Sequence, residues 1–86
     1  MSVHGKLTER QRQVLILIAE GYSHSQVADK LRISPKTAEQ HVRNIVSRYR
    51  VSRAIQAVVL ALRKGHIDLA EIRVSPDRID DEILLE

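Results

Sequence analysis

Amide and cationic side chains gather between residues 36 and 53 of this chain, and their chemistry suits a nucleic acid. The guanidinium of Arg43 can donate two hydrogen bonds to the O6 and N7 atoms of a guanine. The amide of Gln40 can pair in the same two-pronged way with the N6 and N7 atoms of an adenine. Hydroxyl groups and further cations suit phosphate oxygens, and the candidates for such contacts are Ser23, Ser25, Ser34, Lys36, Thr37, Arg48, Arg50 and Arg53.

The distribution of charge supports the same kind of partner. Residues 1–66 hold 12 Lys and Arg against 4 Asp and Glu, a net charge of +8. Residues 67–86 hold 2 basic and 7 acidic side chains, a net charge of −5. A basic body favours a polyanion, and charge alone leaves DNA, RNA and an anionic lipid surface as alternatives. The acidic end can raise solubility, contact a partner, or compete with phosphate for the basic face.

Several classes of function find no support in the composition. The chain has no cysteine, which excludes disulfides, thiolate metal sites and thiol nucleophiles and suits a reducing cytoplasm. Its four histidines lack the spacing of paired metal ligands. The sequence has no catalytic constellation or phosphate-binding glycine loop, and no apolar run long enough to span a membrane. We predict a soluble, cytoplasmic protein that is not an enzyme and holds no metal or cofactor.

Capping motifs predict the elements that position these side chains. Residues 8–11 read Thr-Glu-Arg-Gln and residues 23–26 read Ser-His-Ser-Gln, and both match the capping box that opens a helix. Gly21 can adopt the left-handed conformation that ends the first helix. A chain of 86 residues buries a single core, and without Phe or Trp that core must be mainly aliphatic.

A third helix is predicted over about residues 35–50. Ser34 offers a hydroxyl cap, and Pro35 stands at the first helical position, where its missing N–H costs nothing. Apolar side chains recur along the helix as one buried stripe, namely Ala38, Val42, Ile45 and Tyr49. Gln40 and Arg43 lie on the opposite surface. With the tight turn before it, this helix completes a helix-turn-helix, whose second helix lies in the major groove of double-stranded DNA.

The fourth predicted helix is apolar almost all the way round. Ser52 is its expected cap, and Gly65 is its expected end. Small side chains at 54, 57, 58 and 61 suit close packing on the core. Ile55, Val59 and Leu62 form a second face of larger side chains, which so small a domain cannot bury by itself. This face is expected to meet another protein surface or to be covered by the C-terminal segment.

Spaced residues from position 7 to position 67 resemble the LuxR-type (NarL/FixJ) helix-turn-helix family. The residues that carry the resemblance are Leu7, Thr8, Arg10, Val14, Leu15, Ile18, Ala19, Gly21, Ser23, Ala28, Leu31, Ile33, Ser34, Thr37, His41, Val51, Gln56, Ala57, Val58, Ala61 and Gly65. In that family the third of four helices reads the major groove, and the fourth commonly mediates dimerisation. The resemblance implies an all-α domain that binds double-stranded DNA as a homodimer and regulates bacterial transcription.

The resemblance also assigns roles by position. It places three side chains at the bases, namely Glu39, Gln40 and Arg43. It places three others near the DNA backbone, namely Lys36, Thr37 and Arg48. The family often has Lys where this chain has Glu39, so the carboxylate there must accept from a cytosine amine or pair with Arg43. Two further departures are Ala38, where Val is usual, and Gln11 and Gln13, where acidic residues are common.

The domain organisation leaves alternatives open. We assign residues 1–67 to the helix-turn-helix domain and residues 68–86 to an acidic extension. Residues 68–74 can be extended, and Ser75 to Asp77 can start a fifth helix. A protein-interaction module on a helix-turn-helix scaffold and a sigma-factor-like promoter reader are the alternative functions. Without a receiver or ligand-binding domain, the chain is a stand-alone regulator or the DNA-binding part of a longer one.

Overall fold

Four α-helices and one short 3₁₀ turn make up residues 7–74, the part of the chain that the computed structural model describes. The elements are α1 (Glu9–Ala19), α2 (His24–Leu31), α3 (Pro35–Tyr49), α4 (Ala54–Arg63) and η1 (Leu69–Glu71). The described residues contain no strand. The predicted all-α class and the order of four helices are therefore confirmed.

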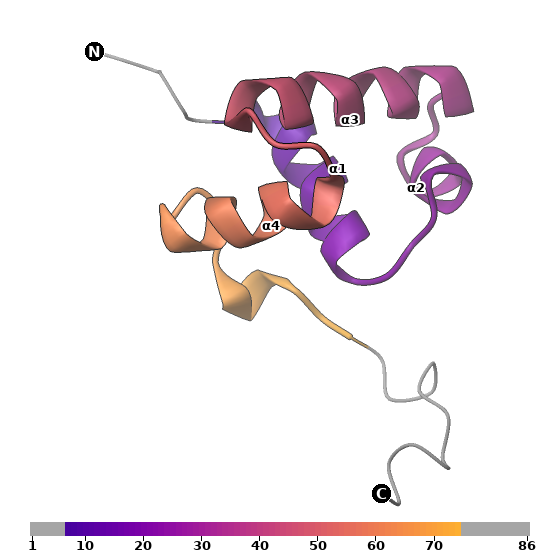
Figure 1. Cartoon of the computed structure of the whole chain (residues 1–86). Helices are drawn as coiled ribbons and strands as arrows, with labels where there is room; N and C mark the ends of the chain where they lie inside the picture. Colours follow the sequence, from indigo (N-terminus) through magenta and orange to yellow (C-terminus); the bar gives the residue numbers. More distant parts are fainter. Residues whose placement is uncertain (1–6, 75–86) are drawn as a thin grey trace, which may run out of the picture.

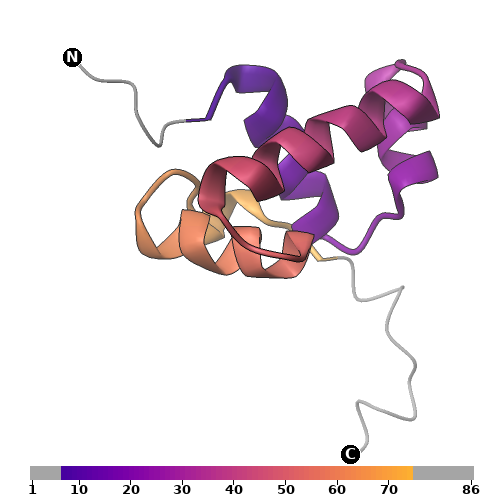
Figure 2. The ribbon, with the colours of Figure 1, turned by 45° about the horizontal axis from the view of Figure 1, so that its top comes forward.

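Helix α1 is the centre of the arrangement, because it packs against each of the other three helices. Helix α3 runs along one edge of the molecule, with α2 near its start and α4 near its end (Figure 1). When the top of that view is turned forward, α3 crosses in front of α1 (Figure 2). One face of α3 thus packs against the other helices, and the opposite face is open to solvent.

The first three helices begin where the capping residues predict. The hydroxyl of Thr8 accepts the backbone N–H of Gln11 at 3.0 Å, and the Gln11 side chain accepts the N–H of Thr8 at 3.1 Å. Ser23 and Gln26 form the same reciprocal pair at the start of α2. Ser34 accepts the N–H of residue 37 at the start of α3. These bonds satisfy N–H groups that have no partner inside the helix.

The predicted start of α4 is wrong by one residue. Its N-cap is Arg53 and its first residue is Ala54, so Ser52 does not cap it. The side-chain oxygen of Gln56 folds back and accepts the backbone N–H of Ser52 at 3.0 Å and of Arg53 at 2.9 Å. The side-chain amide of Gln56, in the first turn, thus accepts N–H groups at the helix start, where the hydroxyl of Ser52 was expected to act as the cap. The helix ends as predicted, before Gly65 at φ +76°.

The core lies between the helices and is almost entirely aliphatic. Its buried apolar residues are Val14, Leu15, Val27, Ala28, Ala38, Val42, Ile45, Tyr49, Ala57, Val58, Ala61 and Ile67. The stripe predicted on α3 is among them, and Ala38 is fully buried in spite of its small size. Gln11 is the buried polar side chain of the described region, and its oxygen accepts a hydrogen bond from Arg48 at 3.0 Å. Gln11 therefore joins the start of α1 to the end of α3.

The first part of the acidic extension turns back onto α1. After η1, the backbone N–H of Arg73 donates to a carboxylate oxygen of Glu20 at 2.8 Å. Glu71 pairs with Arg12, and the backbone N–H of Asp68 together with Arg12 holds the pKa of the Glu71 carboxyl below its usual value. The expected fifth helix from residue 75 lies outside the described residues.

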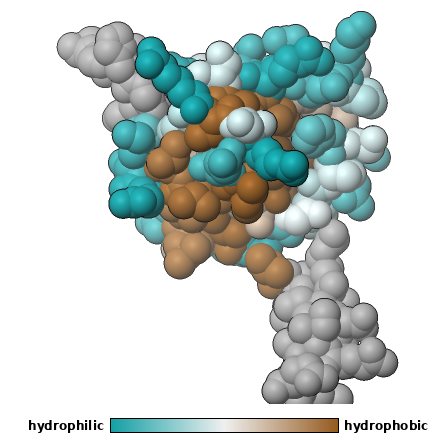
Figure 3. All heavy atoms as spheres, in the orientation of Figure 1, coloured by the Kyte–Doolittle hydropathy of each residue, from teal (hydrophilic) through white to brown (hydrophobic). Residues whose placement is uncertain are grey.

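The larger face of α4 is open within the described region. Ile55 is 59% exposed and Val59 is 49% exposed, whereas Leu62 is half-buried. Apolar residues gather over α4 in the middle of the molecular face, and hydrophilic residues border them along the α3 edge (Figure 3). Asp68 and Leu69 border a hollow beside Leu62, whereas Ile55 and Val59 stay open to solvent. An exposed apolar surface of this kind is typical of a site that another surface covers.

Candidate nucleic-acid interface

The outward face of α3 presents the side chains that could read a base. Glu39, Gln40 and Arg43 are all exposed, and Lys36 lies one turn before them. They lie there because the apolar stripe at every third or fourth residue faces the core, which leaves the opposite side of the helix outside. The structure thus brings the three predicted base-facing residues together on one surface.

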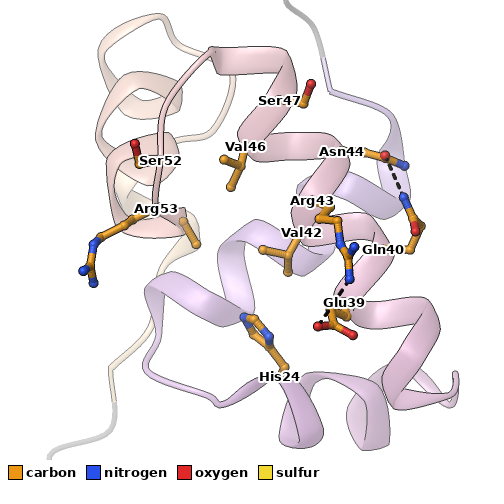
Figure 4. A pocket seen from close by; sticks show the side chains of 11 residues that line it. His24, Glu39, Gln40, Val42, Arg43, Asn44, Val46, Ser47, Ser52 and Arg53 are labelled. Carbon is orange, nitrogen blue, oxygen red and sulfur yellow. Dashed lines mark hydrogen bonds and ion pairs between the residues drawn. The ribbon is translucent and has the colours of Figure 1, made fainter.

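Two pairs of side chains bridge successive turns of this surface. A carboxylate oxygen of Glu39 lies 3.5 Å from a terminal nitrogen of Arg43. The amide nitrogen of Gln40 donates to the side-chain oxygen of Asn44 at 3.1 Å. Figure 4 shows the two pairs side by side on α3. The negative charge of Glu39 is thus set against a cation of its own helix.

An open groove of about 810 Å³ follows α3 on the side that faces α2 and α4. Val42 and Val46 of α3 give it an apolar strip, and His24 approaches from the start of α2 (Figure 4). The remaining lining residues are Glu39, Gln40, Arg43, Asn44, Ser47, Ser52, Arg53 and Ala54. Two arginines are among the lining residues, Arg43 on α3 and Arg53 at the start of α4. A groove of this kind is wide and polar enough to suit an anionic backbone, the phosphate contact that positions a protein on DNA.

The hydroxyl-bearing candidates lie at the starts of α2 and α3, and all of them are exposed. The oxygens of Ser23 and Ser34 already accept backbone N–H groups as helix caps. The hydroxyl of Ser34 also donates to that of Thr37 at 2.8 Å. Ser25 lies in the first turn of α2. Helix starts with these residues offer hydroxyl and N–H donors to phosphate oxygens.

The three arginines proposed for the DNA backbone lie in different surroundings. Arg53 lines the groove at the start of α4. Arg48 points toward α1, where one of its nitrogens donates to Gln11 at 3.0 Å. Arg50 follows the last residue of α3 and adopts the left-handed conformation, with φ +58°. Only Arg53 therefore shares the groove with the base-facing residues.

Three polar groove residues were missed by the sequence reasoning. Asn44 follows Gln40 by four residues, so the helical period alone could have found it. His24 and Ser52 come from other segments and reach the groove only through the packing of α2 and α4 on α3. No local signal in the sequence marks these two.

A family model described as bacterial regulatory proteins of the luxR family matches residues 5–61. The chain belongs to this luxR family. The resemblance found in the sequence is thereby confirmed, and the chain carries a LuxR-type helix-turn-helix DNA-binding domain. The family consists of bacterial DNA-binding regulators of transcription.

Known proteins similar to this luxR-family chain are themselves regulators. The response regulator protein VraR of Staphylococcus aureus and that of Staphylococcus epidermidis are each 44% identical to it over 61 residues. The match covers 71% of this chain and 29% of each relative, so the chain spans less than a third of the length of these relatives. A solved structure of the transcription factor GerE superposes with a TM-score of 0.70 at 35% identity, covering 73% of this chain and 94% of that one.

Residues 7–74 lack the features of two other kinds of site. No helix in this range is long and apolar enough to cross a membrane. No group of three or more His, Asp or Glu side chains in it could hold a metal ion.

Proposed function

We propose that this chain is a sequence-specific regulator of bacterial transcription that inserts α3 into the major groove of double-stranded DNA. The observation that carries the proposal is the exposure of Gln40 and Arg43 on the side of α3 opposite its buried stripe. An α-helix with its side chains is about 10 to 12 Å wide and fits a major groove that is about 12 Å wide. Because bacterial DNA lies in the cytoplasm, we place the protein there.

Base contacts and backbone contacts are assigned to different parts of the surface. Arg43 donates to a guanine, and Gln40 pairs with an adenine. The start of α2, the start of α3 and Arg53 contact the phosphates on either side of the groove. Arg48 has five N–H donors, so it can contact a phosphate while one of them is held by Gln11.

A second copy of the chain is proposed to cover the exposed face of α4. Ile55 and Val59 are about half exposed, and Leu62 extends the same face by one turn. A two-fold axis through such a face pairs it with itself, which is the usual geometry of homodimers. Two recognition helices related by this axis would then read the two halves of a pseudo-palindromic operator.

Selection of bound duplexes from a random DNA pool tests the proposal. The full chain should enrich one motif, and its affinity for that motif should fall steeply with salt, because bound phosphates release counterions. A chain that enriches no sequence, or whose affinity ignores salt, would contradict sequence-specific DNA binding. If that chain nevertheless self-associates through α4, the interaction-module alternative gains support.

The substitution Arg43→Ala tests the assignment of the reading residue. It should cost about 1 to 3 kcal/mol on the selected duplex and relax the preference at one base pair. Arg63→Ala is the matched control, because it removes the same charge from an exposed position at the end of α4. Equal losses for the two variants, with an unchanged base preference, would mean that Arg43 acts only through its charge. Fluorescence anisotropy with matched and mismatched duplexes measures both quantities.

A further inference from the structure

The outward face of α3 carries two bridged pairs of the same spacing. Glu39 and Arg43 form an ion pair four residues apart, and Gln40 and Asn44 form a hydrogen bond four residues apart. All four side chains are exposed, and the side chains of the ion pair keep 55% and 65% of their surface open. Each pair holds one of the two proposed readers, Gln40 or Arg43, against a second side chain of the same face.

The chemistry of each pair indicates which member reads. Arg43 can donate two parallel hydrogen bonds to a guanine, whereas the carboxylate of Glu39 is repelled by the surrounding phosphates. After bonding to Asn44, Gln40 keeps its side-chain oxygen and one N–H. Those are the two groups that the N6 and N7 atoms of adenine require. In this pair Asn44 is the acceptor, and its side-chain oxygen fixes the orientation of the Gln40 amide.

We propose that Glu39 and Asn44 are positioning residues, which hold Arg43 and Gln40 in the orientations that read a guanine and an adenine. The inference rests on the proposed function and adds the division of labour within the reading surface. A free Gln or Arg side chain loses rotamer freedom when it binds, and a side chain that is already held loses less. The carboxylate at position 39 then supports recognition through Arg43 and does not read cytosine.

The spacing of the two readers limits the sequence that they recognise. Gln40 and Arg43 are three residues apart, which is about 4.5 Å along the helix axis at 1.5 Å per residue. Successive base pairs are about 3.4 Å apart along the duplex. The adenine and the guanine should therefore occupy neighbouring base pairs in each half-site, or base pairs separated by one.

Substitutions at position 44 test the support of Gln40. Asn44→Ala should lower the preference for the adenine about 2- to 10-fold, the value of one immobilised side chain. Asn44→Asp keeps an oxygen that accepts from Gln40, so it should bind all duplexes more weakly but keep the adenine preference. If the Asn44 amide instead contacts a base directly, Asn44→Asp should lose the base preference, because the aspartate has no N–H to donate. Ser47→Ala is the matched control, since Ser47 is also exposed on α3 and lines the same groove.

The substitution Glu39→Gln tests the support of Arg43 through two effects of opposite sign. Removal of a negative charge should raise the affinity for every duplex, because the phosphates no longer repel it. The preference for the guanine should nevertheless fall about 2- to 10-fold, because Arg43 is no longer held by an ion pair. If Glu39 instead reads a cytosine directly, the preference should change at that base pair and remain at the guanine.

Duplexes with altered bases complete the experiment. Replacement of the selected adenine by 7-deazaadenine removes the N7 acceptor, and the wild type and Asn44→Ala should then bind equally. Circular dichroism melts should agree for all variants, because the substituted side chains are exposed. A wild type that selects no motif would overturn the proposed function and this inference with it. A wild type that selects a motif, with unchanged base preferences in Asn44→Ala and Glu39→Gln, would overturn this inference alone.

Discussion

The outward faces of α3 and α4 are both open to solvent, but their chemistry is opposite. The face of α3 is covered with charged and amide side chains that already pair with one another. The face of α4 presents Ile55 and Val59, with about half of each side chain in water. Water favours the first surface and disfavours the second. The contrast favours a polar, charged partner for α3 and another apolar surface for α4.

Both faces depend on one small core, so the largest effect is expected there. Ile45 lies in the stripe of α3 and is only 1% exposed. Ile45→Ala should lower the free energy of unfolding by about 2 to 5 kcal/mol, because it leaves a cavity between the helices. Chemical denaturation followed by circular dichroism measures this change. Gln40→Ala on the same helix should leave stability nearly unchanged, and an equal loss in both variants would contradict the division between core and surface.

The next largest effect concerns self-association through α4. Val59→Asp should weaken the dimer by about 2 kcal/mol or more, because the substitution removes apolar area and would bury a carboxylate. Val74→Asp is the control, since Val74 is 53% exposed and lies outside α4. Sedimentation velocity over a range of concentrations measures the dimer, and a wild type that stays monomeric at the highest concentration would contradict the proposed interface.

A smaller effect separates stability from DNA binding at the ends of α2 and α3. Arg32 and Arg50 both adopt the left-handed conformation, with φ +59° and +58°, which glycine adopts without strain. Arg32→Gly and Arg50→Gly should each raise stability by about 0.5 to 1 kcal/mol. Only Arg50→Gly should also reduce the salt dependence of DNA binding by about one phosphate contact. Thermal melts and anisotropy titrations in parallel would show whether the two properties separate.

The sequence predicted the helix starts well where the signal was local. Thr8, Ser23 and Ser34 cap the helices that they were expected to cap, because a cap acts on N–H groups only three residues away. Ser52 failed for the same kind of reason, since Gln56 competes for the same end and satisfies two N–H groups at once. The start of α4 was therefore mispredicted because two nearby side chains, Ser52 and Gln56, could both accept the N–H groups there.

The candidate site was predictable only in part. The helical period placed Gln40 and Arg43 on the outer side of α3, and Asn44 was overlooked although it obeys the same period. The groove beside α3 could not be predicted, because His24 and Arg53 reach it through the packing of three helices. The role of Arg48 also depends on tertiary structure, since its partner Gln11 lies 37 residues away.

A last effect, similar in size to that of the glycine substitutions, concerns the link between the two outward faces. The hydroxyl of Tyr49, the last residue of α3, forms a 2.6 Å hydrogen bond with Nδ1 of His66, just beyond α4. Burial raises the pKa of Tyr49 above its ordinary value of 10.0, because the ionised phenolate is poorly solvated there. The unfolded chain therefore releases this proton at a lower pH than the folded one. Stability contributed by the neutral phenol is fully present below pH 10 and is lost as the pH rises through the folded pKa.

Tyr49→Phe isolates this contribution, because phenylalanine fills the same space and cannot ionise. The variant should be less stable than the wild type at neutral pH, by about 1 kcal/mol for the lost hydrogen bond. As the pH rises above about 10, the wild type should lose stability faster, so the difference between the two should shrink. Urea denaturation at several pH values measures it. A difference that stays constant to alkaline pH would mean that Tyr49 ionises as readily in the folded chain as in the unfolded one, and that its ring does not tie α3 to α4 in a desolvated contact.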